Sequence, residues 1–369
     1  MSSVLEAIRN RHNLSLSLIV TGMHLLPEFG STVREIEQDG YAIAARVDMA
    51  PPSPHTGGMV QSLGSAIQDI SHAIEKADPD IILVQGDRGE SLAGAIAGAY
   101  LKVPVAHVSG GDVTEGGMID NSIRHCITKL AHLHFPGTEV SAERIRCMGE
   151  DPLRIFMVGT PSLLSHRDIR EADVGRVLAR LDIRREPPLL LVLQHPVTYE
   201  SEFAAQQMRE TMDAIADLGE QTVVIFPNSD AGGREMIEVI RSYAHHRNIR
   251  MTENLPFRDF IALLSAASVL IGNSSGGIVR TPALGIPCIN IGTRQKNREH
   301  AGNIVDTTYN RREIVQAVKR ILRDPGIHDR ILAMDTPYKD TGTGTRIAEI
   351  LATVDLDAGL LIKEFHPCR

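Results

Sequence analysis

Short apolar segments alternate with helix-like segments along most of the chain, and most of the apolar segments end in glycine or polar residues. Such a pattern is typical of βαβ units, in which helices bury both faces of a parallel sheet. The sequence therefore predicts an α/β protein with parallel sheets. The expected strands are residues 16–20, 81–85, 103–108, 130–136, 154–158, 188–194, 221–227, 249–252, 268–271 and 288–291.

The length of 369 residues predicts two such units rather than one, because a single hydrophobic core usually stops growing at about 250–300 residues. The strand pattern restarts after a charged, helix-like stretch at 166–187, and we place the boundary between residues 163 and 164. Other helices are expected at 2–11, 58–76 and 91–101. No strand precedes the first of these, although a doubly wound domain normally has its first strand at the centre of the sheet.

Composition excludes several classes of partner. Interleaved acidic and basic residues give a net charge of −8, which argues against nucleic acid. The chain has neither the long apolar run of a membrane span nor the layout of a signal peptide, so we expect a cytoplasmic protein. Its cysteines show no CxxC pair and no spacing that suits zinc, so we expect buried free thiols, no metal and no cofactor. They are Cys126, Cys147, Cys288 and Cys368.

The residues that follow the predicted strands are the strongest indication of function. In open α/β sheets, ligands bind outside the carboxyl ends of the strands. Here those ends carry polar and glycine-rich turns, and any one of them could simply cap a helix. Five turns in series favour a ligand site. The turns are residues 86–88, 109–112, 194–196, 227–230 and 272–277.

The turn at 272–277 reads Gly-Asn-Ser-Ser-Gly-Gly. Glycines let the backbone approach an anion closely, and free N–H groups at a helix start point toward it. We therefore expect a diphosphate site here, with an ordinary helix cap as the alternative. The turn also fits the G-x-S-x-G elbow of α/β-hydrolases, with Ser274 as nucleophile and with Asp306 and His366 in the right order, but few strands remain to build that sheet.

Three aspartates, Asp87, Asp112 and Asp120, could supply acid–base chemistry at the same edge. Carboxylates that share a partly desolvated site cannot all stay ionised, so the pKa of one should rise and that group can act as an acid. Paired carboxylates of this kind cleave glycosidic C–O bonds. Asp120 and Arg124 are four residues apart near a helix that we expect to begin at residue 122, so an exposed ion pair is the alternative.

Basic groups that could hold phosphate oxygens follow two strands of the second half. His195 lies between a strand and Pro196, so its ring can project from the strand end and play a positive or hydrogen-bonding role towards a diphosphate. Arg294, Lys296 and Arg298 form a basic patch in an acidic chain, and guanidinium groups bind phosphate well. A structural histidine and a solvated loop are the alternatives.

Together these stretches resemble the hydrolysing UDP-N-acetylglucosamine 2-epimerases of sialic-acid-type and legionaminic-acid-type sugar biosynthesis. The likeness runs from about residue 14 to about residue 350 and depends on five motifs in order. They are GDRGESLAGAIAGAYLKVPVAHVSGGD, IDNSIRHCITKLAHLHFPGTE, LQHPVT, FPNSDAGG, and IGNSSGGI with ALGIPCINIGTRQKNRE. The resemblance implies a GT-B fold, with two Rossmann-like domains and the active site between them, and a C-terminal segment 343–369 that completes the first domain.

The resemblance also implies a reaction. Proton loss at C2 and departure of the nucleotide diphosphate at C1 would give a 2-acetamidoglucal. Water would then add and release the free 2-epimeric sugar, N-acetylmannosamine in the standard case, without nicotinamide or an obligate metal. The resemblance implies a homo-oligomer, a dimer or tetramer. The implied catalytic residues are Asp87, Asp112, Asp120, Arg124 and His195, and the implied substrate contacts are Arg88, His24, Asn228, Ser274, Ser275, Gly276 and Arg294.

Two positions depart from the family pattern. The family normally begins with a strand and a Gly-Thr/Ser-Arg-Ala-Asp/Glu turn, and neither precedes the first expected helix. The family also places a glutamate after the serine-glycine turn, to hold the ribose, where this chain has Arg280. The alternatives that stay open are a non-hydrolysing 2-epimerase, a nucleotide-sugar-binding remnant without catalysis, a GT-B glycosyltransferase, and a diacetylated bacillosamine-type donor on UDP or GDP.

Overall fold

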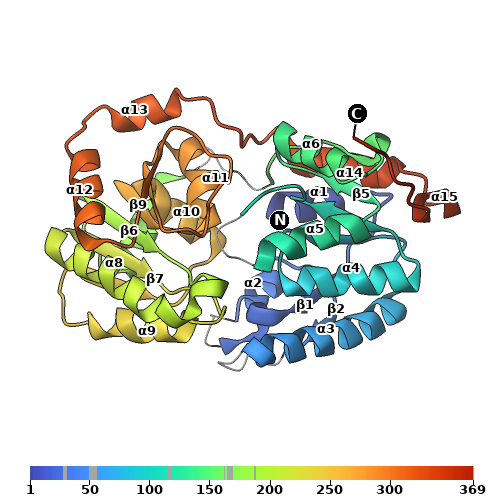
Figure 1. The fold of residues 1–369 in the computed structure, drawn as a ribbon, viewed down its shortest axis with the longest axis horizontal. Coiled ribbons are helices and arrows are strands. Elements are labelled where there is room, and N and C mark those ends of the chain that lie inside the picture. Colours follow the sequence, from blue (N-terminus) through green and yellow to red (C-terminus); the bar gives the residue numbers. More distant parts are fainter. Residues whose placement is uncertain are drawn as a thin grey trace.

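The computed structural model describes residues 1–27, 31–49, 56–114, 119–161, 163, 169–186 and 188–368. These residues form two groups of strands covered by helices, which lie side by side in Figure 1. The first half of the chain builds one group and the second half builds the other. None of the described helices is long and apolar enough to cross a membrane.

The second half of the chain forms a six-stranded parallel sheet in the order β11-β10-β9-β6-β7-β8. The strand that comes first in this half, β6, therefore lies inside the sheet, which is the doubly wound arrangement. The strands are β6 (Leu189–Leu193), β7 (Gln221–Ile225), β8 (Ile249–Thr252), β9 (Val269–Gly272), β10 (Cys288–Ile291) and β11 (Ile304–Thr307).

Helices cover both faces of this sheet because its central strands are apolar on both sides. Leu190 of β6 packs into one core cluster, and the next residue, Leu191, packs into another on the opposite face. The helices of the first cluster are α8 (Ala204–Leu218), α9 (Gly233–Ser242) and α12 (Arg311–Leu322), and those of the second are α7 (Glu171–Arg180), α10 (Phe257–Ala266) and α11 (Ser275–Leu284).

The first half of the chain contains two smaller parallel sheets, β1-β2 and β3-β4-β5. Helix α4 packs closely on the second of these because Gly98 has no side chain; a Cβ there would lie 2.6 Å from a methyl carbon of Val105. The strands are β1 (Leu18–Thr21), β2 (Ile43–Val47), β3 (Ile82–Gln85), β4 (Val105–Val108) and β5 (Leu133–Phe135). The helices are α1 (Ser2–Arg9), α2 (Val33–Gln38), α3 (Thr56–Ala77), α4 (Gly89–Leu101), α5 (Ile119–Leu130) and α6 (Glu139–Cys147).

The C-terminal segment returns to the first group. After α13 (Ile327–Leu332), helix α14 (Thr343–Thr353) packs against α1, and its residue Ile347 shares a core cluster with β4 and β5. The two segments that connect the groups of strands contact each other. Gly159 forms a β-bridge with Asp340, and the Thr160 N–H donates to the Lys339 carbonyl at 2.9 Å. We therefore propose one domain of residues 1–163 plus 343–369 and a second of residues 164–342.

Some predicted elements differ from the structure. The strand expected at 154–158 is wrong: Pro152–Arg154 form a 3₁₀ turn, and only Ile155 makes a single bridge, to His134. Helix α5 begins at Ile119 rather than at 122, which places Asp120 inside its first turn instead of at a cap. Strands β2 and β11 were not predicted. Of the helix expected at 166–187, α7 is observed, while 166–168 and 187 lie outside the described residues.

Candidate active site

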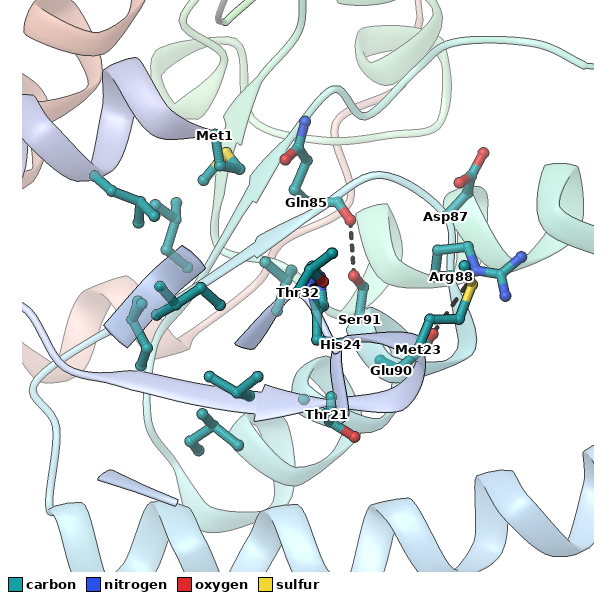
Figure 2. Close-up of a pocket in the computed structure, with 18 of the residues that line it drawn as sticks. Met1, Thr21, Met23, His24, Thr32, Gln85, Asp87, Arg88, Glu90 and Ser91 are labelled. Carbon is teal, nitrogen blue, oxygen red and sulfur yellow. Dashed lines mark hydrogen bonds and ion pairs between the residues drawn. The ribbon is translucent and has the colours of Figure 1, made fainter. Parts of the chain in front are cut away.

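A cavity of about 1450 Å³ lies between the two groups of strands, and polar strand ends from both line it. Figure 2 shows Asp87, Arg88 and Glu90 close together after the end of β3 on one side of this cavity. Two of the predicted site residues, Asp112 and Arg124, do not line it. Those that do are His24, Asp87, Arg88, Asp120, His195, Asn228, Ser274, Ser275, Gly276 and Arg294.

The start of α11 presents the expected anion-binding turn. The Ser274 side chain caps the helix by accepting a hydrogen bond from the Gly276 N–H at 3.3 Å. Gly272 lets this turn pass close to β6, because a Cβ there would lie 2.1 Å from the Leu193 carbonyl oxygen. Ser275 and Gly276, the first residues of this helix, line the cavity, and an anion there is stabilised by the helix N-terminus.

Asn273 fixes His195 beside this turn. Its side-chain oxygen accepts from the His195 N–H at 2.7 Å, and its amide donates to the His195 carbonyl at 2.9 Å. The ring Nδ1 of His195 accepts from the Asn228 N–H at 3.1 Å, so the ring hydrogen lies on Nε2. Burial, reinforced by Arg294, lowers the pKa of His195 to about 3. Of the two expected roles, the structure therefore favours a neutral hydrogen-bond donor over a positive charge.

Arg88, which lines the cavity, forms an ion pair with Asp230 of the other half of the chain. The Arg88 Nη1 lies 2.6 Å from Asp230 Oδ1, and Asn228 donates to the other carboxylate oxygen at 2.7 Å. Burial by itself would raise the pKa of Asp230, but the Arg88 charge outweighs it and the pKa is lowered. The side-chain oxygen of Asn228 is buried and has no partner among the described residues, so it can still accept a hydrogen bond from a ligand.

Arg294 provides a second cation in the cavity. Its Nη1 donates to the Asn273 carbonyl at 3.2 Å, while its Nε is buried without a partner among the described residues. Burial is the largest influence and lowers its pKa. Arg294, Arg88 and the start of α11 together place several donors where a diphosphate would lie. Lys296 of the expected basic patch is exposed instead and does not line the cavity.

Asp120 is the carboxylate whose pKa is raised. It lies in the first turn of α5, is 8% exposed and lines the cavity. Burial and the negative charge of Asp230 raise its pKa to about 6, against the opposing effect of Arg88 and Arg294. A carboxyl group with a pKa near neutrality can take up and release a proton at physiological pH.

Asp87 and Arg124 form an ion pair at the floor of the cavity. Arg124 is buried and also donates to the Asp112 carbonyl at 3.0 Å. Its burial lowers its pKa to about 9. Arg124 therefore holds Asp87 in place and does not itself line the cavity.

Asp112 is turned away from the cavity. Its Oδ1 accepts from the Ser141 hydroxyl at 2.8 Å, and its Oδ2 accepts from Arg298 Nη2 at 2.7 Å. The expected trio of aspartates is therefore a pair, Asp87 and Asp120, because α6 and the Arg298 loop hold the third side chain behind them. Asp112 positions Arg298, which does line the cavity.

Asp230 and Glu90 were not predicted as site residues, and Arg298 was predicted only as part of a basic patch. Asp230 and Arg298 lay in turns that the sequence singled out, yet nothing in the pattern showed that each would pair with a residue of the other half. Glu90 lines the cavity, 3.8 Å from Arg88 Nε. Acidic residues are common in the first turn of a helix, so the sequence gave no reason to assign Glu90 to a ligand site.

The hydrolase alternative does not fit the structure. Asp306 of β11 accepts a hydrogen bond from Asn290 at 2.8 Å, and His366 lies in the C-terminal tail, where its N–H donates to the Gly149 carbonyl. Neither residue lines the cavity that Ser274 faces. The triad of Ser274 with His366 and Asp306 is therefore excluded.

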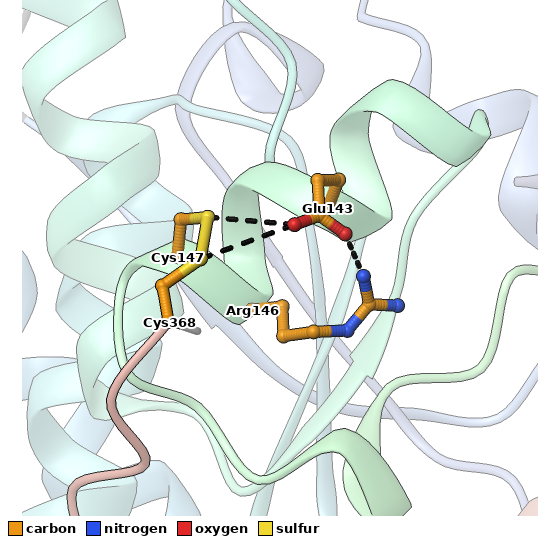
Figure 3. The surroundings of a disulfide bond; sticks show 4 residues. All are labelled: Glu143, Arg146, Cys147 and Cys368. Carbon is orange, nitrogen blue, oxygen red and sulfur yellow. Dashed lines mark hydrogen bonds and ion pairs between the residues drawn. A yellow bond between two sulfur atoms is a disulfide. The ribbon is translucent and has the colours of Figure 1, made fainter.

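The cysteines lie away from the cavity, and the expectation of buried free thiols is wrong for three of them. Cys147 at the end of α6 forms a disulfide with Cys368 of the C-terminal tail (Figure 3). Cys126 is a free cysteine and is exposed. The pairing spans 221 residues of sequence, and spacing cannot reveal such a contact. The exposed carboxylate of Glu143 lies beside the two sulfurs, which the disulfide makes unavailable as thiolate metal ligands.

Comparisons with known proteins agree with this geometry. A family model described as UDP-N-acetylglucosamine 2-epimerase matches residues 6–352. A UDP-N,N'-diacetylbacillosamine 2-epimerase (hydrolyzing) from Legionella pneumophila is 32% identical over 363 residues, covering 98% of this chain and 94% of the relative. A GDP/UDP-N,N'-diacetylbacillosamine 2-epimerase (hydrolyzing) from Campylobacter jejuni is 30% identical, covering 87% of this chain and 83% of the relative.

Solved structures show the same architecture. The crystal structure of UDP-GlcNAc 2-epimerase from Neisseria meningitidis bound to UDP-GlcNAc matches with a TM-score of 0.75 over 95% of each chain, at 16% identity. At this identity the likeness concerns the fold alone. The expected GT-B fold, with two Rossmann-like domains and a cleft between them, is confirmed.

Proposed function

The chain belongs to the UDP-N-acetylglucosamine 2-epimerase family, and from this premise we propose that it is a hydrolysing 2-epimerase. Its substrate is UDP-N-acetylglucosamine or a related N-acetylated amino-sugar nucleotide. Its products are the nucleoside diphosphate and the free 2-epimeric sugar. The names of the relatives from Legionella and Campylobacter, which both contain the word hydrolyzing, support this choice over a non-hydrolysing epimerase.

The diphosphate of the substrate binds at the start of α11. Ser274, Ser275 and Gly276 of this turn line one side of the cavity, and Arg88 and Arg294 supply positive charge. The Nε2–H of the neutral His195 ring adds a hydrogen-bond donor. These groups stabilise the charge that develops on the leaving diphosphate when the bond from C1 to oxygen breaks.

The first step removes the proton at C2. We assign this proton to the carboxylate of Asp120, because a general base works best when its pKa lies near the working pH. The electron pair of the C2–H bond forms the C1–C2 double bond, and the C1–O electron pair leaves with the diphosphate. The product of this step is a 2-acetamidoglucal.

The second step hydrates the glycal. A water oxygen bonds to C1, and a proton is delivered to C2 on the face opposite to the one from which the first proton left. We assign to the Asp87 carboxylate the relay of this proton from the attacking water to C2, because Asp87 lines the same cavity and is held by Arg124. Asp120 releases to solvent the proton that it took in the first step. The sum of both steps is one water consumed, one C1–O bond broken and the configuration at C2 inverted.

The observation that carries this proposal is the position of Asp120. A carboxyl group with a pKa of about 6 lies in the same cavity as the anion-binding start of α11. The group that exchanges the proton and the groups that stabilise the leaving diphosphate therefore line one cavity.

The test is incubation of the protein with UDP- and GDP-linked N-acetylglucosamine and N,N'-diacetylbacillosamine in D₂O, followed by NMR. We expect free nucleoside diphosphate and free 2-epimeric sugar with one deuterium at C2. Asp120→Asn should abolish turnover, while Asp329→Asn, a change of an exposed aspartate of α13, should not. An epimeric nucleotide-sugar as the product would favour a non-hydrolysing epimerase, and binding of nucleotide without any turnover would favour the remnant.

A further inference from the structure

Arg280 lies in the cavity, where the proposed reaction gives it no role. It follows Gly276 by one turn of α11 and lines the same cavity as Ser274. Its guanidinium carbon lies 5.0 Å from the centroid of the Phe257 ring, at the first residue of α10. Phe257 and the neighbouring Leu255 also line the cavity. A mostly buried, planar cation on an aromatic face is therefore built into this wall.

The position of this wall suggests which part of the substrate it meets. This step rests on the proposed function, in which the diphosphate binds at the start of α11 and the sugar lies toward Asp120 of the other domain. The nucleoside must then extend along the second domain. Arg280 is four residues beyond Gly276, which corresponds to about 6 Å along a helix at 1.5 Å per residue. That distance is within the reach of a nucleoside attached to the diphosphate. The arginine side chain is longer than the glutamate that holds the ribose at this position in the family, so it can extend past the ribose to the base.

We propose that Arg280, supported by Phe257, forms the nucleobase subsite and that this subsite selects guanine. A guanidinium group has five N–H donors and no acceptor. Guanine offers it two adjacent acceptors, O6 and N7, which match the two-pronged geometry of arginine. In uracil, the N3–H donor lies between the two carbonyl oxygens, so no edge of the base offers arginine two adjacent acceptors. Adenine has an amino donor beside N7, and that donor faces the N–H groups of arginine.

The ring of Phe257 makes the subsite more selective. It holds the guanidinium group by a cation–π contact, which limits the directions in which the N–H groups can point before the base arrives. A fixed donor pair loses less conformational freedom on binding than a flexible one. Lysine could keep the charge at this position but could not provide two parallel donors.

The experiment is calorimetric titration of the full chain with GDP, UDP and ADP. We expect GDP to bind about tenfold more tightly than UDP, as one bidentate pair provides, and ADP to bind most weakly. Two further ligands test the contact without changing the protein. Inosine diphosphate keeps O6 and N7 and should bind like GDP, whereas 7-deaza-GDP lacks the N7 acceptor and should bind about as weakly as UDP.

Variants test the residue itself. Arg280→Gln and Arg280→Lys should bring the GDP affinity to within about threefold of that for UDP. The matched control is Arg258→Gln, which removes an exposed arginine next to Phe257 that does not line the cavity; it should leave the preference unchanged. Circular dichroism and the melting temperature show that each variant is folded.

The outcomes separate this inference from the function on which it rests. Equal or tighter binding of UDP by the wild-type protein would overturn the guanine assignment, and so would a preference for GDP that survives both substitutions at Arg280. In either case the nucleotides still bind, and the proposed epimerase function stands. If no nucleotide diphosphate binds at all, both proposals fail.

Discussion

The Arg88 guanidinium and the Asp230 carboxylate pair at 2.6 Å between the two domains, one after β3 and the other after β7. This pair governs the charge of a third residue, Asp120. The Asp230 charge raises the pKa of Asp120, whereas the Arg88 charge lowers it. An incoming diphosphate would compete with Asp230 for Arg88. The pair therefore couples occupancy of the phosphate site to the proton affinity of the carboxylate that we assign as the base.

Removing the Asp230 charge should shift the pH dependence of turnover. If Asp120 must be ionised to take the C2 proton, kcat falls as pH drops through the pKa of about 6. Asp230→Asn removes a negative charge that raises this pKa and leaves Arg88 less neutralised, so the pKa of Asp120 should drop. We expect the acid limb of the kcat profile to move to lower pH, measured by nucleoside diphosphate release between pH 4.5 and 8.5.

The matched control for this profile is Asp329→Asn, which removes an equal charge at an exposed position. Its acid limb should coincide with that of the wild-type protein. If the limb of Asp230→Asn does not move, or moves upward, Asp120 is not the group that titrates in the reaction.

Asp120 should also reduce the stability of the protein at neutral pH. Its pKa in the folded state is about 6, above the ordinary value of 3.8. Between these two pH values the folded state holds a proton that the unfolded state has lost, so the free energy of unfolding decreases as pH rises. The loss is complete above pH 6 and amounts to about 3 kcal/mol, because one pKa unit corresponds to about 1.4 kcal/mol.

Asp120→Asn removes this cost, so the variant should be inactive and yet more stable. We expect its free energy of unfolding in urea to exceed that of the wild-type protein by on the order of 2 kcal/mol at pH 7.5, with little difference at pH 4. A variant that is less stable than the wild-type protein at pH 7.5 would show that Asp120 makes favourable contacts as an anion.

The carboxyl ends of the strands could be predicted from the sequence because they depend on local chemistry. The turn at Ser274 follows an apolar strand and precedes a helix. Such a turn needs glycines because only a residue without a Cβ lets the backbone come close to a neighbouring strand or a ligand. The central strands β6, β7 and β9 were visible as apolar runs for a similar reason, since both of their faces are buried. Strand β2, which alternates between partly buried and exposed residues, gave no such run.

The direction in which each side chain points could not be predicted from the sequence. Asp112 and Asp120 looked equivalent as acids near strand ends, yet one faces Ser141 and Arg298 and the other faces the cavity. Their difference comes from packing between segments that are far apart in the sequence. The same holds for Cys147 and Cys368, whose pairing depends on the return of the C-terminal tail to α6.

His195 should stay neutral throughout the working pH range. Its pKa of about 3 results first from burial and then from the nearby Arg294. We expect the ¹³Cε1 and ¹⁵N chemical shifts of the His195 ring to be constant between pH 5 and pH 8, with the hydrogen on Nε2. A histidine-containing model peptide in the same buffer provides the comparison, because its ring signals titrate near the ordinary pKa of about 6.5. Titration of His195 in the same range would indicate a cationic role at the diphosphate.

Asp112 and Arg298 should behave as one unit rather than as two independent site residues. Their ion pair is buried, with 10% and 9% of the two side chains exposed. Removing one partner leaves an unpaired buried charge or an unmet donor, so Asp112→Asn and Arg298→Gln should each reduce the free energy of unfolding by about 3 kcal/mol. The double variant should lose clearly less than the sum of the single losses, because the second change removes the charge that the first left unpaired.

Turnover should fall to a similar level in all three proteins, since Asp112 acts on the cavity only by positioning Arg298. Additive losses in urea unfolding, or an Asp112→Asn variant far less active than Arg298→Gln, would instead assign Asp112 a separate contact with the substrate.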